Sequence, residues 1–204
     1  MKKILIIAIL GAFCTTTNAQ NGRRAVETYN YFGISAGLTQ FTINTDEANV
    51  TSGNGWNAGL STRGSLRRNL DMVYFLHLSE SRFSVEANDI SNVLQPNEQV
   101  EYKLLAAKLG LLASYKIIGH NLSIEAGPML QLSDKLKYDE GFENFVVTGN
   151  ETVSIDDFAR TSNINFHVAG GLTLGFKHFR VYGLYEYGLT NMLSKIDTES
   201  GKLK

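Results

Sequence analysis

The sequence is poor in the residues on which several common protein classes depend. Among its 204 residues there are one cysteine, two prolines and four histidines. A single cysteine, Cys14, cannot form an internal disulfide or complete a thiolate metal site. The formal net charge of −1 gives no basic excess, so we expect no nucleic-acid partner. Beyond the N-terminus no apolar run approaches the ~18 residues that a membrane-spanning helix needs.

The N-terminus has the three regions of a secretory signal peptide. Two lysines precede an apolar stretch at residues 4–13, and small and polar residues then follow up to Ala19. The stretch is too short to cross a bilayer of ~30 Å as a helix, and Ala19 supplies the small residue needed at a cleavage site. We therefore predict a signal peptide at 1–19 and one mature domain at 20–204.

Glycine, tyrosine and phenylalanine are abundant, which favours strands joined by turns. In the clearest strand, 99–118, residues such as Leu109 and Leu111 alternate with Lys108 and Lys116. Its length exceeds the ~5–6 residues of an ordinary strand and suits ~9–11 residues across lipid plus an extension. The same alternation predicts seven strands in all, at 31–43, 54–64, 71–88, 99–118, 121–133, 161–176 and 179–190.

The links between these strands alternate in length. Three are short (65–70, 119–121 and 177–178), and three are long and polar (44–53, 89–98 and 134–160). Short periplasmic turns opposite long extracellular loops are typical of outer-membrane barrels. We therefore expect an all-β fold: an antiparallel up-and-down transmembrane β-barrel of the eight-stranded type, in the cell outer membrane of a Gram-negative bacterium.

Seven strands leave two unpaired edges, whereas single-chain bacterial barrels have an even number of strands, starting at eight. The residues after Asn191 resemble a fourth outer loop, and residues 202–204 would begin or precede the eighth strand. We therefore expect that the last strand is missing and that the domain is C-terminally truncated. A natural seven-strand fragment and a wrongly assigned strand are the alternatives.

Two local features carry expectations of their own. Within 72–87 the apolar positions change parity between Leu78 and Phe83, which predicts a bulge near Ser81.

The longest link, 134–160, is predicted to be the main surface-exposed element and contact site, because recognition usually resides in loops on a rigid scaffold. Its apolar centre around 145–147 is expected to form a hairpin with 152–155.

The polar face of the strands should line the lumen. An eight-stranded barrel has an interior just wide enough for side chains, so charged groups there must pair with each other or with trapped water. We expect a structural network of ion pairs, with a proton or ion path as the alternative. The residues placed there are Arg63, Lys108, Lys116, Glu125, His167, Arg180 and Glu186.

No arrangement in the sequence predicts catalysis. The histidines lie in strands (His77 and His167) or in turns (His120 and His178), without the spacing of metal ligands. No Gly-x-Ser-x-Gly motif is present. We therefore expect no catalytic residue, no metal, no cofactor and no enzymatic activity.

Three segments together carry a family resemblance. They read Tyr-Phe-Gly-Ile-Ser-Ala-Gly at 31–37, Ile-Glu-Ala-Gly-Pro at 124–128, and Val-Tyr-Gly-Leu-Tyr-Glu-Tyr-Gly-Leu-Thr-Asn at 181–191. With the signal peptide they resemble the PorT-like outer-membrane β-barrel family (porin-like barrels). The resemblance implies an eight-stranded barrel without an assigned activity. It also implies a C-terminal aromatic that the barrel-assembly machinery recognises, and this sequence lacks one.

The preferred functional hypothesis is a structural or surface-interaction role at the cell surface. One alternative is an accessory role in protein export, since the founding member of the resembled family is associated with secretion. The other is a soluble, secreted, lipocalin-like barrel that binds a small apolar ligand. The expected partners are the lipid bilayer of the outer membrane, the barrel-assembly machinery, and a surface or secretion-system protein.

Overall fold

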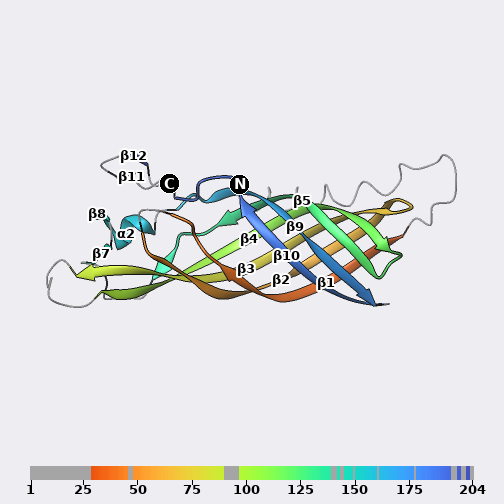
Figure 1. The fold of residues 1–204 in the computed structure, drawn as a ribbon, viewed down its shortest axis with the longest axis horizontal. Coiled ribbons are helices and arrows are strands. Elements are labelled where there is room, and N and C mark those ends of the chain that lie inside the picture. Colours follow the sequence, from red (N-terminus) through yellow and green to blue (C-terminus); the bar gives the residue numbers. More distant parts are fainter. Residues whose placement is uncertain are drawn as a thin grey trace, which may run out of the picture.

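The computed structural model describes residues 29–45, 48–89, 97–138, 142, 145–148, 150–159, 161–176, 178–193, 197–198 and 201–202. Seven antiparallel strands form the wall of one sheet, in the order β1-β2-β3-β4-β5-β9-β10 (Figure 1). Their bounds are Asn30–Phe41 (β1), Val50–Arg67 (β2), Leu70–Asp89 (β3), Glu98–Ile118 (β4), Leu122–Ser133 (β5), Ile164–Phe176 (β9) and Phe179–Gly188 (β10). The all-β fold and the seven expected strands are therefore confirmed.

The strands form because their sequences alternate with period two, which sends successive side chains to opposite faces. The outer face carries a belt of exposed apolar side chains on every wall strand, including Ile34 (84% exposed), Leu60, Leu76, Leu111, Leu172 and Val181. The inner face of the same stretch carries buried Arg63, Lys108 and Glu125. This is the reverse of a lipocalin-like barrel, whose lumen is apolar, and it argues against that alternative.

Tight turns join the strands at one end of the sheet. Between β4 and β5, Gly119 has φ 50°, a left-handed conformation that glycine adopts without a Cβ clash. The amide of Asn121 donates to the carbonyl of Ile118 across this turn at 2.9 Å. The longer links lie at the other end. Among the described residues no helix is long and apolar enough to span a membrane.

The two edges of the wall are β1 and β10, and within the described residues they do not pair with each other. Each neighbouring pair along the path is antiparallel, so the first and seventh strands run in the same direction. The expected eighth strand stays a prediction. The expected signal peptide lies outside the described residues.

The change of parity on β3 has a different cause from the predicted bulge. β3 pairs with β4 in one unbroken register from Leu70↔Tyr115 to Ala87↔Glu98, and the register shift near Ser81 comes from an extra residue on β2, between Ser52 and Gly55. Phe83 and Val85 remain on the inner face with Ser79 and Ser81. The prediction of a bulge in β3 is therefore wrong: the polarity of the two faces inverts, while the strand continues.

This inversion marks the end of the apolar belt. Beyond Leu78 and Leu105 the outer face carries a charged collar, which consists of Glu80, Arg82, Glu101 and Lys103. Above the collar the inner face becomes apolar. The long strands β3 and β4 thus pass from a surface that suits lipid to one that suits water.

The described elements of the link between β5 and β9 lie at the end of the wall opposite the tight turns (Figure 1). The link contains β6 (Lys137–Tyr138), which pairs with β4, then β7 (Phe145–Val147), β8 (Asn150–Ser154) and α2 (Ile155–Phe158). β7 pairs with β8 and also extends the wall beside β3. The expected hairpin is confirmed.

The apolar centre of this link is buried against the inner face of the wall, and the role of 134–160 as the main contact site stays a prediction. Val147, Ile155 and Phe158 are at most 1% exposed. They pack with Phe83 and Tyr102 in an apolar core that we call the dome core. The physical reason is the inverted polarity of β3 and β4, which gives these side chains an apolar inner wall to cover.

Candidate functional site

The seven residues predicted for the lumen lie on the inner face of the wall, and most of them fall into two groups. The turn-side cluster contains Arg63 (β2), Lys116 (β4) and Glu125 (β5), with Arg180 (β10) beside it. The mid-lumen cluster contains Lys108 (β4) and Glu186 (β10), with His167 (β9) nearby. Residues from strands far apart in the sheet order meet in both groups.

The turn-side cluster is centred on Arg63, whose side chain is 8% exposed. Its guanidinium forms an ion pair with Glu125 and donates through Nη1 to Ser114 Oγ at 2.6 Å. Ser114 in turn donates to Glu125 Oε1 at 3.1 Å. The Glu125 carboxylate thus has two partners in a site that excludes water, where a charge without a partner is costly.

Asp71 extends this cluster toward the tight turns. Its Oδ1 lies 2.8 Å from Lys116 Nζ, and its Oδ2 lies 3.6 Å from Arg63 Nη1. The Tyr29 hydroxyl donates to Oδ2 at 2.5 Å, and Lys116 Nζ lies 4.9 Å from the centre of the Tyr29 ring. Two cations and two carboxylates therefore balance, and Tyr29 covers them.

Arg180 lies beside this balanced group without an ion pair in the described part of the chain. It interacts electrostatically with Arg63, Asp71 and Glu125. A Cβ added to Gly175 would lie 2.8 Å from Arg180 Nη1. Glycine at this position therefore leaves room for the guanidinium at the inner wall.

The mid-lumen cluster joins β4 to β10 across the lumen. Lys108 Nζ lies 2.6 Å from Glu186 Oε2. The His77 ring stacks on Phe75 with ring centres 4.5 Å apart, and His77 Nε2 lies 2.9 Å from Ser35 Oγ. These contacts fill the middle of the lumen with side chains.

A glycine makes this packing possible. A Cβ added to Gly110 would lie 2.1–2.8 Å from three atoms of the Phe75 ring. Separations below 3.0 Å are not tolerated, so the ring can cover this part of β4 only because residue 110 has no side chain.

Sequence reasoning missed three members of these groups, Asp71, Tyr29 and His77. The alternation of side chains along β3 could have identified two of them. Asp71 and His77 are odd-numbered and lie on the inner face, whereas even-numbered Leu76 lies on the outer face. Tyr29 precedes the first strand, where alternation carries no information. It reaches Asp71 only because β1 and β3 lie on either side of β2.

The arrangement offers little for catalysis or metal binding within the described residues. No group of three or more histidine, aspartate or glutamate side chains there could hold a metal ion. Ser35 and His77 form a hydroxyl–imidazole pair, but no carboxylate in the described part is hydrogen-bonded to the other ring nitrogen. A hydrolytic triad needs that third group to orient the imidazole.

The dome core lies on the inner face of the wall, at the end opposite the tight turns. Tyr102 is at its centre, fully buried, with its ring stacked on Phe83 at 5.5 Å. Its hydroxyl donates to the carbonyl of Ile155 at 3.0 Å, which fastens α2 to the wall. Phe158 packs on the same ring at 5.5 Å.

Comparison with known proteins agrees with this architecture. A family model described as outer membrane protein beta-barrel domain matches residues 18–194. No curated protein and no solved structure matches the chain.

Proposed function

The chain belongs to the outer membrane protein beta-barrel domain family and is located in the outer membrane, and we propose that it is a non-conducting barrel with a surface-contact role. The contacts are made by the dome, a name we give to β6, β7, β8 and α2 together with the dome core that they cover. The outer-membrane assignment follows from the family and the apolar belt. The role as a surface-contact element is the proposal.

One observation carries the proposal: buried side chains meet across the inner face of the wall at three successive levels. The turn-side cluster lies near the tight turns, the mid-lumen cluster lies in the middle, and the dome core lies at the other end. A diffusion pore needs a continuous polar passage, which the apolar dome core interrupts. The function supported best is therefore one performed by the outer surface of the barrel and its dome.

Conductance in planar bilayers tests this proposal. We expect no large, persistent open-channel currents from the full chain, because ion pairs and the dome core occupy the lumen. As a matched control, residues 137–158 are replaced by a short glycine-serine linker in an Arg63→Ser, Glu125→Ser background. This variant lacks the dome core and the Arg63–Glu125 ion pair and keeps the mid-lumen cluster, so its conductance should exceed that of the unmodified chain. Large steady currents from the unmodified barrel would contradict the proposal.

We further propose that the dome faces outside and the tight turns face the periplasm. Two single-cysteine variants in a Cys14→Ser background test this orientation: Glu98→Cys near the dome and Asn121→Cys in a tight turn, both at exposed positions. A membrane-impermeant maleimide applied to intact cells should label position 98, and position 121 only after permeabilisation. The opposite labelling pattern would show that the topology is inverted.

Several finer assignments remain part of this proposal. We propose that residues 1–19 are a signal peptide, that 20–204 is the barrel domain, and that the barrel-assembly machinery of a Gram-negative cell inserts it. The segments at 31–37, 124–128 and 181–191 support a place among PorT-like barrels. A surface or secretion-system protein would then be the partner of the dome, and an accessory role in export is the second candidate.

A further inference from the structure

The charges at the turn-side end of the lumen do not balance. The cations of the turn-side cluster are Arg63 and Lys116, and they pair with the carboxylates of Asp71 and Glu125. Arg180 on β10 adds a third cation. The carboxylates in the described part of the chain that interact with it electrostatically are the same two. Three cations therefore share two anions, and this end of the lumen has one positive charge in excess.

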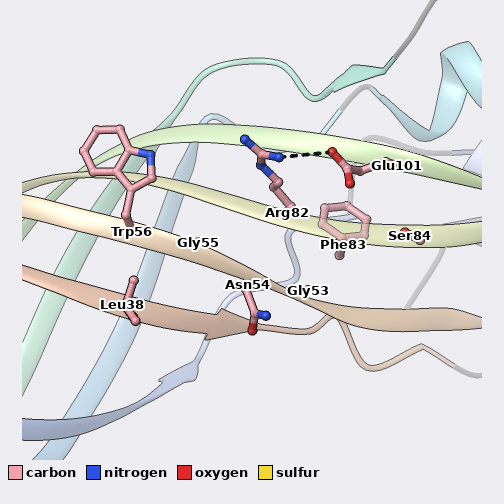
Figure 2. Close-up of a pocket in the computed structure, with 9 residues that line it drawn as sticks. All are labelled: Leu38, Gly53, Asn54, Gly55, Trp56, Arg82, Phe83, Ser84 and Glu101. Carbon is pink, nitrogen blue, oxygen red and sulfur yellow. Dashed lines mark ion pairs between the residues drawn. The ribbon is translucent and has the colours of Figure 1, made fainter.

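Arg82 on the charged collar shows by contrast how an arginine of this wall is paired. Its Nη2 lies 3.0 Å from Glu80 Oε1, and its Nη1 lies 3.7 Å from Glu101 Oε1 on the outer surface (Figure 2). The half-buried side chain of Arg180 has no such carboxylate partner among the described residues. The arginine that is more shielded from water is thus the one without an ion pair.

An unused hydroxyl group lies beside Arg180 on the neighbouring strand. Thr173 (β9) is 2% exposed, and its Oγ1 has no hydrogen-bond partner in the described part of the chain. In the pairing of β9 with β10, Thr173 is opposite Tyr182, and Gly175 is opposite Arg180. Because a buried hydroxyl without a partner is costly, its presence here indicates that a ligand binds it.

Gly175 brings the guanidinium close to this hydroxyl. A Cβ added to Gly175 would lie 2.8 Å from Arg180 Nη1, so the guanidinium lies over β9 at a position without a side chain. Thr173 is two residues away on the same face of that strand. Positions two apart on one face are ~6–7 Å from each other, a separation that one ion with two hydrogen bonds of ~3 Å can bridge.

We propose that the turn-side end of the lumen binds a small inorganic monoanion, chloride, between Arg180 and Thr173. The guanidinium supplies the positive charge and N–H donors, and the hydroxyl donates a further hydrogen bond. With the anion bound, three cations face three negative charges. The proposal concerns the inside of the barrel and does not depend on the role proposed for the dome.

Charge and size select this class of ligand. A dianion would more than cancel the single excess charge and leave the lumen negative. A bulky organic anion does not fit a narrow lumen in which side chains are already packed. A water molecule could accept the hydrogen bond of Thr173, but it carries no charge and leaves Arg180 unbalanced.

The linkage between chloride binding and folding tests the proposal. The full chain is reconstituted in lipid vesicles and unfolded reversibly in urea, with the fluorescence of its single tryptophan, Trp56, as the signal. Chloride replaces gluconate, a bulky monoanion, at constant ionic strength. Raising chloride from about 1 mM to about 100 mM should increase the ratio of folded to unfolded chain about tenfold, for a dissociation constant of about 10 mM.

Two variants and one matched control identify the groups responsible. Arg180→Gln should abolish the dependence on chloride. Thr173→Val keeps the shape of the side chain and should be as stable as the unmodified chain without chloride, because its hydroxyl has no partner there, but it should lose most of the gain. Arg67→Gln removes an exposed cation at the same end of the wall and should keep the tenfold effect.

Three results would overturn the proposal. A stability that does not change with chloride would show that water alone solvates Arg180 and Thr173. A chloride effect that persists in Arg180→Gln would be a general effect of the salt. A Thr173→Val protein already destabilised without chloride would show that the hydroxyl binds another group of the protein.

Discussion

Replacing Glu125 by leucine will destabilise the barrel by about 3–5 kcal/mol, because it leaves a buried charge without its partner. Arg63 is 8% exposed on its side chain, and its guanidinium forms an ion pair with Glu125. The remaining neighbours, Ser114 and Asp71, cannot replace that contact, since Asp71 already binds Lys116 at 2.8 Å. Reversible urea unfolding in lipid vesicles, followed by Trp56 fluorescence, measures the change in the free energy of unfolding.

Two further variants separate the ion pair from general damage to the strand. The double variant Arg63→Met, Glu125→Leu removes both charges and should recover most of the lost stability, because apolar pairs of similar volume replace buried ion pairs well. Glu80→Gln removes a carboxylate from the exposed collar and should cost below about 1 kcal/mol. If Glu125→Leu costs no more than Glu80→Gln, the turn-side cluster is not shielded from water.

Replacing Tyr102 by alanine should cost about 3–5 kcal/mol within the dome, the usual cost of removing a buried aromatic ring. The ring packs against Phe83 and Phe158, and its hydroxyl binds the carbonyl of Ile155. Without it, α2 loses its hydrogen bond and its aromatic contact to the wall. We therefore expect faster proteolysis within 134–160 than in the unmodified chain, in proteoliposomes whose domes face outward.

Two matched variants locate this effect. Tyr102→Phe keeps the ring and loses one hydrogen bond, so it should cost only about 0.5–1.5 kcal/mol and be cleaved at nearly the rate of the unmodified chain. Leu105→Ala shortens an outward-facing side chain of the same strand, 47% exposed, and should not change cleavage in 134–160. A Tyr102→Ala protein as resistant as the unmodified chain would show that the dome core does not hold this link in place.

The strands of the wall could be predicted from the sequence because alternation is a local property. In β4, Leu109 and Leu111 face lipid, and Lys108 faces the lumen, for the simple reason that they are adjacent or two apart on an extended chain. The same parity placed Glu125 and Glu186 on the inner face. Register and partners were less accessible, since they depend on strands that are distant in the sequence.

The ion pairs illustrate this limit. The expected network contained Lys116, but its carboxylate partner is Asp71 from β3, which the sequence reasoning did not include. Glu186 could be assigned to the lumen by parity, yet its pairing with Lys108 depends on how far the wall curls between β4 and β10. Curvature of a sheet arises from the twist and stagger of all its strands together.

The class of fold, the positions of the strands, and the lipid-facing and lumen-facing sides of the belt follow from the order of residues alone, because each depends on neighbours one or two positions apart. The dome could not be obtained in that way. On β3, Phe83 and Val85 are as apolar as Leu76 and Leu78, but the former face a packed core above the collar and the latter face lipid. Whether an apolar side chain of a strand faces lipid or a packed core depends on what lies on that side of the strand. That environment changes where the wall leaves the membrane and the 134–160 link packs against it.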